Sequence, residues 1–222
     1  MKELTLIIPA KNESESLPQV LNELKKFDLK IKILLQEDDI YTIQAIKGFD
    51  CEIIFQNNPG YGNALIQGIN ITKTKYFCIF NADGSFNPDE LKEMFKKLEN
   101  SNADFVFASR YQEHSGSDDD TLITAIGNFI FTKIGNIFFR LPITDILYTF
   151  VMGKTDKAKI LSLEKSDFGF CVELPIKAKR NNFKLISSNS YERKRIAGKK
   201  KVNAFRDGFL ILIYMIKIFF KK

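Results

Sequence analysis

Short apolar runs rich in β-branched residues alternate with segments of helical periodicity along the first half of this chain. Five runs are predicted to be strands: 4–10, 31–36, 51–56, 76–82 and 104–109. Between them, apolar side chains share one helical face at 17–24 and again at 91–98, where Pro88 and acidic residues mark a helix start. This βαβα order predicts an α/β fold with a mostly parallel central sheet, in which ligands bind at the carboxyl ends of the strands.

The second half of the sequence is less regular. It predicts a long apolar helix at 121–141, a helix at 171–182 that Pro175 bends or delimits, a strand within 183–193 and a basic loop at 192–201. Because 222 residues with 45% apolar content suit one sizeable core, we expect a single domain over 1–202, followed by an amphipathic helix at 203–222.

Charge and cysteine content narrow the classes of partner. The net charge of +6 favours an anionic partner: nucleic acid, a phosphorylated small molecule or an acidic membrane surface. Nucleic acid is disfavoured because the basic residues are not interleaved with aromatic residues on a predicted sheet face. The three cysteines match neither a zinc pattern nor a disulfide framework, and no secretory signal is visible, so we expect a cytoplasmic protein.

Polar clusters follow each predicted strand. In chain order they read KNES, EDD, NNPGYGNA, NADGS and RYQ. In NADGS, the Asn, Asp and Gly suit an ordinary turn, in which Asp83 satisfies nearby amides. The alternative is a metal site, because the hard oxygen of Asp83 suits a Mg²⁺ or Mn²⁺ ion that bridges a diphosphate.

The ordered set of motifs resembles a known family. LIIPAKNES, NNPGYGNALIQGI, KYFCIFNADGSFNPDEL and FASRY, in this order and spacing, resemble the family 2 glycosyltransferases, especially the branch that transfers sugars to dolichyl or polyprenyl phosphate. The likeness is strong over about residues 3–112, and weaker echoes continue to about 202 in ITDILYTFVM, FCVELPIKAKRNNFKL and RIAGKKKV. The resemblance implies a Rossmann-like GT-A fold and a nucleoside-diphosphate-sugar donor.

The resemblance also implies a set of donor-binding residues. Those expected to contact the nucleotide are Pro9, Ala10, Asn12, Glu13, Asp38, Asp39, Gly62, Asn81, Ala82 and Lys201. Two alternatives stay open on the residues alone: the PAKNE segment also suits a plain helix entry, and Gly60 and Gly62 suit either close approach to a ligand or a loop before a helix. The usual Asp-Asp-Gly-Ser is replaced by EDDIYT, which leaves the identity of the base open.

Two departures from the family pattern bear on the metal. The family's Asp-x-Asp is here Asn81-Ala82-Asp83, and Ser85 stands where the polyprenyl branch often has Gln. Asn81, Asp83 and Ser85 are the predicted metal ligands, with Asp83 the principal one. Because one formal negative charge is missing, we expect a weakened metal site.

Arg110 and Arg195 are predicted to be catalytic with Asp83, since a guanidinium binds phosphate oxygens in bidentate geometry. Lys199 and Lys201 add point charges, and a solvated basic loop is the alternative for both lysines. Three acids, 118–120, would repel an acceptor phosphate unless a cation or arginine intervened, yet acids also suit a helix N-terminus. Glu173 and Asp145 are possible bases that spacing alone cannot assign.

The C-terminal segment has bulky apolar residues around most of its circumference and lysines at its end, which suits an in-plane membrane helix, a partner-binding helix or a buried core helix. With the helix at 121–141, it favours an enzyme bound peripherally to the inner face of the cell membrane. The expected function is metal-dependent, inverting sugar transfer to a lipid phosphate or glycan, as a homo-oligomer or with a membrane partner. The alternative is a weak or inactive nucleotide-sugar-binding subunit of a glycan-assembly complex.

Overall fold

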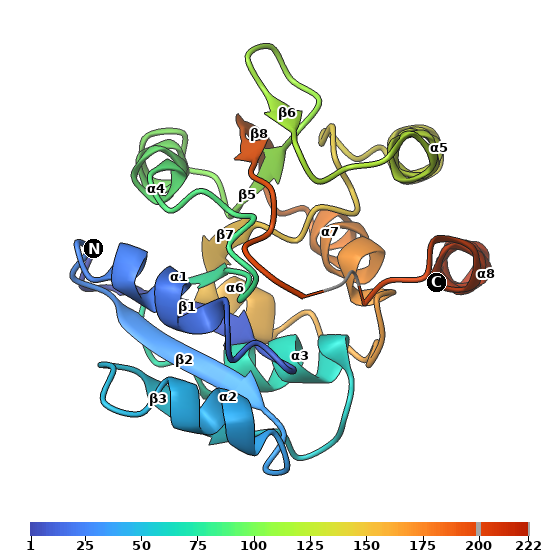
Figure 1. The fold of residues 1–222 in the computed structure, drawn as a ribbon. Helices are drawn as coiled ribbons and strands as arrows, with labels where there is room; N and C mark the ends of the chain where they lie inside the picture. Colours follow the sequence, from blue (N-terminus) through green and yellow to red (C-terminus); the bar gives the residue numbers. More distant parts are fainter. Residues whose placement is uncertain (199–200, 222) are drawn as a thin grey trace.

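A seven-stranded sheet runs through the protein, with helices on both of its faces (Figure 1). The computed structural model describes residues 1–198 and 201–221. Within them the strands of this sheet are β1 (Leu4–Pro9), β2 (Lys30–Leu35), β3 (Glu52–Phe55), β4 (Tyr76–Ile79), β5 (Phe105–Ser109), β7 (Val151–Lys154) and β8 (Leu185–Asn189). Their spatial order is β3-β2-β1-β4-β7-β5-β8, and β6 (Gly116–Ser117) pairs with β9 (Tyr191–Glu192) in a small second sheet.

The predicted α/β class with a mostly parallel sheet is confirmed. β1 pairs in parallel with β2 and β4, β2 with β3, and β5 with β8. The sequence analysis missed β7, which lies antiparallel between β4 and β5. Its segment, VMGK, is four residues long, and a run this short carries no periodicity that separates a strand from a loop.

Two apolar layers cover the sheet because successive strand residues point to opposite faces. One layer packs under α1 (Leu17–Leu24), α2 (Ile40–Ala45) and α4 (Glu90–Asn100). The other packs under α3 (Tyr61–Ile71), α6 (Thr155–Lys159) and α7 (Phe170–Arg180). Pro175 lies inside α7, which continues through it, and the three cysteines are free thiols.

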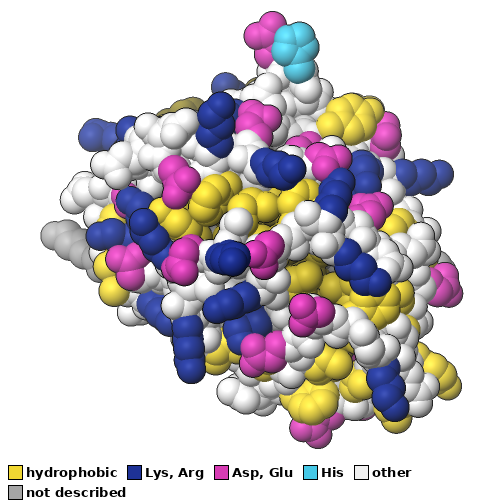
Figure 2. Space-filling view, turned by 90° about the vertical axis from the view of Figure 1, so that its left-hand side faces the viewer, with side chains coloured by type: hydrophobic (Ala, Val, Ile, Leu, Met, Phe, Trp, Pro, Cys, Tyr) yellow, Lys and Arg dark blue, Asp and Glu magenta, His cyan; other side chains and the backbone are white. Residues whose placement is uncertain are grey.

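The two most apolar helices, α5 (Leu122–Phe139) and α8 (Ala204–Phe220), lie side by side at one flank of the protein (Figure 1). Figure 2 shows the opposite flank, where basic and acidic side chains are interspersed among apolar ones. α8 begins close to the boundary predicted at 203, but it packs against the second apolar layer through Ile211, Tyr214, Met215 and Ile218. The division of the chain at 202 stays a prediction.

The inserted strand β7 depends on a glycine. A Cβ atom at Gly153 would lie 2.4 Å from the ring of Phe105 and 3.1 Å from that of Phe77, which are its neighbours on the flanking strands. We expect Gly153→Ala to lower the free energy of unfolding by about 1–3 kcal/mol, because the added methyl overpacks this layer. Urea unfolding followed by circular dichroism measures the difference.

The matched control is Gly127→Ala on α5, where an added Cβ meets no atom within 4 Å. In a helix this change should leave stability unchanged or raise it by up to about 1 kcal/mol. Equal stability of Gly153→Ala and the parent protein would contradict the packing described for β7.

Candidate active site

The carboxyl ends of β1, β2 and β4 meet at one edge of the sheet. The Ala10 amide donates to the Leu34 carbonyl at 2.8 Å, and the Phe80 amide donates to the Ile7 carbonyl at 3.0 Å, so the chains leave these strands side by side. Beyond β1, the Asn12 amide donates to the Asp39 carboxylate at 2.7 Å. The structure therefore brings the polar clusters that follow these three strands together on one rim.

Glu13 and Asp39, two of the predicted nucleotide contacts, are tied into the rim by hydrogen bonds. Asp39 also caps α2 by accepting from the Thr42 amide at 3.3 Å, and the Thr42 hydroxyl accepts from the Glu13 amide at 2.9 Å. The Glu13 carboxylate accepts from the Ser16 hydroxyl at 2.7 Å and forms an ion pair with Lys201. Both carboxylates are mostly buried. Asp39 is therefore a helix cap as well as a predicted nucleotide contact, and the EDDIYT segment did not reveal this structural role.

The remaining predicted nucleotide contacts differ in accessibility. Asp38 and Asn12 are exposed and Pro9 is half-buried, so these three can meet a ligand directly. Ala82 is only 3% exposed and its side chain packs in the core, which leaves only its backbone for ligand contact. Donor binding by all four residues stays a prediction.

The Asn81–Ser85 segment forms a tight turn at the end of β4. The Ser85 amide donates to Asp83 Oδ1 at 3.0 Å, the Asn81 side-chain amide donates to the Ser85 hydroxyl at 2.5 Å, and Gly84 adopts a φ of 83°. The turn interpretation of NADGS is therefore correct for the local structure. It does not exclude the metal interpretation, because Asp83 Oδ2 takes no part in the turn and the Asp83 side chain is 18% exposed.

The three predicted metal ligands are not equivalent. Ser85 is 2% exposed and its hydroxyl is bonded to Asn81, whose carbonyl oxygen accepts from the Phe86 amide at 3.3 Å. Within the described part of the chain, no group of three or more Asp, Glu, His or Cys side chains is placed to hold a metal ion. The donor set fits a divalent cation only if Asp83 is its protein anchor and a bound ligand supplies most of the other oxygens.

Arg195 lies opposite Asp83. Its guanidinium is 3.3 Å from Asp83 Oδ2 and binds the Asp119 carboxylate at 2.7 and 3.2 Å. The hydrogen bond to Asp119, followed by the charges of Asp83 and Asp119, raises the pKa of Arg195 above its ordinary value despite partial burial. Arg195 therefore pairs with Asp119, one of the three acids at 118–120, and connects this acidic cluster to Asp83 on the rim.

The segment that carries Arg195 crosses the sheet edge, in red at the centre of Figure 1. The Ile196 amide donates to the Asp83 carbonyl at 2.8 Å, and the Arg193 amide donates to the Ser85 carbonyl at 2.8 Å. The Arg193 guanidinium donates to the Gly84 and Phe86 carbonyls and pairs with Glu23. The sequence analysis missed Arg193 as the clamp on this turn, although the basic run at 193–195 signalled it.

Arg110 is held by carboxylates. It forms a bidentate pair with the fully buried Asp145, with contacts of 2.8 and 3.1 Å, and binds Glu192 at 3.0 Å. Burial opposes its charged form, but Asp145 outweighs this and raises the pKa of the Arg110 guanidinium well above its ordinary value. Arg110 therefore stabilises the structure by pairing with buried carboxylates. Its contact with phosphate stays a prediction. Asp145 is not open to act as a base.

Other predicted site residues have structural partners too. Glu173 is fully buried, accepts from the Glu164 and Lys165 amides and the Tyr214 hydroxyl, and pairs with Lys177, so it is closed to solvent as a base. Among the acids at 118–120, Asp118 accepts from the Tyr191 hydroxyl at 2.8 Å and Asp120 from Tyr111 and Thr124. Lys199 lies outside the described residues.

Gly60 and Gly62 lie close to another backbone segment of the protein. A Cβ at Gly62 would lie 1.9 Å from the Lys165 carbonyl oxygen, and one at Gly60 would lie 2.4 Å from that of Ser166. The Gly62 amide donates to this Ser166 oxygen at 2.9 Å. These glycines, at the start of α3, therefore allow close approach of the protein's own backbone at 165–167. Contact of Gly62 with the nucleotide stays a prediction.

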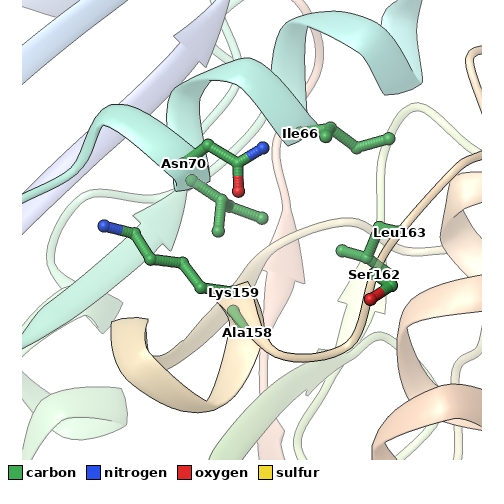
Figure 3. Close-up of a pocket in the computed structure, with 7 residues that line it drawn as sticks. Ile66, Asn70, Ala158, Lys159, Ser162 and Leu163 are labelled. Carbon is green, nitrogen blue, oxygen red and sulfur yellow. The ribbon is translucent and has the colours of Figure 1, made fainter.

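A small cavity of about 90 Å³ lies between α3 and α6 (Figure 3). It is lined by Ile66, Ile69, Asn70, Ala158, Lys159, Ser162 and Leu163. None of these residues belongs to the predicted site, and the Lys159 ammonium near it already donates to the Thr72 carbonyl at 2.7 Å. The predicted site residues therefore lie on the rim and not at this cavity.

Comparison with known proteins places this fold and rim in a family. The family model for glycosyl transferase family 2 matches residues 5–161, and the chain belongs to this family. It is 26% identical over 213 residues to an uncharacterized glycosyltransferase of Mycobacterium tuberculosis, covering 95% of this chain and 94% of that protein. It is 19% identical over 219 residues to the low-salt glycan biosynthesis hexosyltransferase of Haloferax volcanii, covering 96% and 53% of the two chains.

Solved structures show the same GT-A architecture. Glucosyl-3-phosphoglycerate synthase from M. tuberculosis in complex with UDP superimposes with a TM-score of 0.74 at 12% identity, covering 97% of this chain and 79% of that one. Mannosyl-3-phosphoglycerate synthase from Rubrobacter xylanophilus gives 0.74 at 13% identity, covering 97% and 72%. The predicted family and fold type are confirmed, and the protein is a glycosyltransferase.

The Arg110–Asp145 pair predicts a large stability effect. We expect Asp145→Asn to lower the free energy of unfolding by about 3–5 kcal/mol, because it leaves the buried Arg110 guanidinium without its bidentate partner. The control is Glu113→Gln, whose exposed pair with His114 should change stability by less than about 1 kcal/mol. Denaturant unfolding measures both, and a stable Asp145→Asn protein that has lost activity would instead mark this pair as catalytic.

Proposed function

We propose that the protein transfers a sugar from a nucleoside-diphosphate sugar, with Mg²⁺ or Mn²⁺, to a lipid-phosphate or glycan acceptor at the cytoplasmic face of the membrane. The observation that carries this proposal is the Oδ2 edge of Asp83, which takes no part in the turn, lies just beyond the end of a central parallel strand and faces Arg195 at 3.3 Å. Ligands of open α/β sheets bind at this edge.

Relatives in structure support the donor and the cation. Solved complexes of glucosyl-3-phosphoglycerate synthase from M. tuberculosis contain UDP together with Mn²⁺ or Mg²⁺. In this chain Asp83 would hold the cation with the diphosphate oxygens, while Asn12, Glu13 and Asp39 form the nucleoside side of the rim. A bound divalent cation neutralises charge on the leaving diphosphate.

The chain's own cations would assist departure of the nucleotide. Arg195 is 3.3 Å from Asp83, and Lys201 pairs with Glu13 on the neighbouring strand end, so both ammonium and guanidinium groups flank the position of a diphosphate. Groups fixed before the reaction stabilise developing negative charge without reorganising. The family resemblance favours inversion at the anomeric carbon.

The burial of the two possible general bases bears on the choice of acceptor. A phosphate acceptor is already an anion and needs no general base, which agrees with the burial of both Asp145 and Glu173. Lipid phosphate fits this requirement, and so does the phosphoglyceric acid bound by the structural relative from M. tuberculosis. We favour lipid because of the apolar helices α5 and α8.

The second candidate is a nucleotide-sugar-binding subunit with weak or no catalysis. The observation that favours it is the engagement of Asn81 and Ser85 with each other, which leaves Asp83 as the principal cation anchor. Such a subunit would bind the donor and transfer nothing.

Substitutions at two positions separate the candidates. We expect Asp83→Ala to lower kcat/KM for sugar transfer by about a hundredfold or more, because the cation loses its protein anchor. Asn81→Asp should keep or raise turnover and lower the Mn²⁺ concentration needed for half-maximal rate, because it restores a carboxylate. A panel of nucleotide sugars, assayed with and without Mn²⁺ and with polyprenyl phosphate or phosphoglycerate as acceptor, gives the readout.

The control is Asp28→Ala, an exposed carboxylate whose loss should leave the rate unchanged. Undiminished transfer by Asp83→Ala would refute the cation assignment. Calorimetric binding of a nucleotide sugar by a parent protein that transfers to no acceptor would establish the binding-subunit alternative.

A further inference from the structure

Exposed large apolar side chains concentrate on two helices. Of the 21 exposed large hydrophobic residues in the described part of the chain, seven lie on α5 and six on α8. Those on α5 are Leu122, Ile123, Ile126, Phe129, Ile130, Ile137 and Phe138, and those on α8 are Phe205, Phe209, Leu210, Ile216, Phe219 and Phe220. Exposed apolar groups gathered in this way mark an interaction surface rather than ordinary surface scatter.

The two helices form one continuous surface. Gly208 lies beside Phe131, and the Phe138 and Phe219 ring centroids are 5.7 Å apart, so α5 and α8 run side by side in the same direction. On each helix, the exposed residues recur at spacings of three, four and seven, which places most of them along one stripe. Figure 1 shows both helices at the same flank.

The inner face of α5 forms hydrogen bonds with the protein's own backbone. The Asn128 carbonyl oxygen accepts from the Leu147 amide, the Thr132 hydroxyl accepts from the Ile146 amide, and the Asn136 amide donates to the Leu141 and Ile143 carbonyls. By length and composition α5 could cross a membrane, and it is the one described helix that could. Because its inner face carries polar groups that bind 141–147, it suits a position along a lipid surface better than one across a bilayer.

The charges around this surface have one dominant sign. Residues 121–141 contain no Asp or Glu, and within 204–221 the only acid is Asp207, which accepts from the Asn203 amide at the start of α8. The exposed basic side chains are Lys133, Arg140, Arg206, Lys217 and Lys221, of which Lys221 pairs with Glu164 at 3.5 Å. The opposite flank instead mixes both signs (Figure 2). An apolar stripe flanked by basic residues is typical of helices that lie in the headgroup region of anionic membranes.

We propose that the α5–α8 surface docks in the plane of an anionic lipid bilayer. A second copy of the chain fits less well, because a two-fold interface through this surface would set the five basic side chains against the same five on the partner. Docking would bring the rim close to lipid-linked acceptors, and this part of the inference rests on the proposed function. Membrane docking itself does not require sugar transfer.

Cosedimentation with vesicles tests the proposal. The full-length protein should bind vesicles of phosphatidylglycerol and phosphatidylcholine, and bind pure phosphatidylcholine vesicles less, with binding that weakens as salt rises. The double variant Ile126→Ser with Ile216→Ser removes one 52% exposed isoleucine from each helix and should lower the partition coefficient about tenfold or more.

The matched control is Ile40→Ser with Ile160→Ser, which removes isoleucines that are 55% and 60% exposed but lie off the helix pair. It should bind vesicles like the parent protein. The variant Lys133→Glu with Lys217→Glu should lose preference for phosphatidylglycerol. Circular dichroism checks that each variant is folded.

Equal vesicle binding by both isoleucine double variants would overturn the proposal, as would absence of binding by the parent protein. Parent dimers that become monomers in Ile126→Ser with Ile216→Ser, without vesicle binding, would assign the surface to a second copy instead. Asp83→Ala should bind vesicles normally, so failure of docking and failure of the sugar-transfer proposal give different results.

Discussion

The parallel pairing of β1 with β4 is the constraint on which the rest of the structure depends. Its register, from Leu4 opposite Tyr76 to Ile7 opposite Ile79, makes the two strands end together. The polar cluster after β1 and the turn after β4 therefore meet at one edge, although about 70 residues separate them in the sequence. A shift by one residue would turn every side chain of β4 toward the other face of the sheet and would displace the turn that carries Asp83.

Charged side chains at the rim form ion pairs with one another. Arg195 joins Asp83 to Asp119, Lys201 pairs with Glu13, and Arg110 is enclosed by Asp145 and Glu192. Because buried or half-buried charges are costly without partners, these pairs keep the rim ordered before any ligand arrives. The side chains of Arg195 and Lys201 are more exposed than that of Arg110, so their pairs are the more accessible to a ligand.

The apolar flank and the rim are physically connected. The Tyr214 hydroxyl on α8 donates to Glu173 at 3.0 Å, and Glu173 accepts from the Lys165 amide at 2.8 Å. The same loop packs its carbonyl groups against Gly60 and Gly62 at the start of α3. The position of α8 is thus tied through one buried carboxylate to the helix that follows β3 at the rim.

The sequence by itself determined the βαβα order and the family, because these are written in local apolar patterns and in motifs of adjacent residues; it also predicts Asp83 as the central site residue. Spacing alone left the roles of Asp145, Glu173 and Gly62 open, because contacts that hold them come from distant segments: Arg110 is 35 residues from Asp145, Tyr214 is 41 from Glu173, and the 165–167 backbone is about 100 from Gly62. Only the tertiary structure decided the antiparallel place of β7, the clamp formed by Arg193 and the joining of α5 with α8 into one surface. Which side chains become buried or form ion pairs depends on contacts between segments that are distant in the sequence. The spacing of residues along the chain does not predict these contacts.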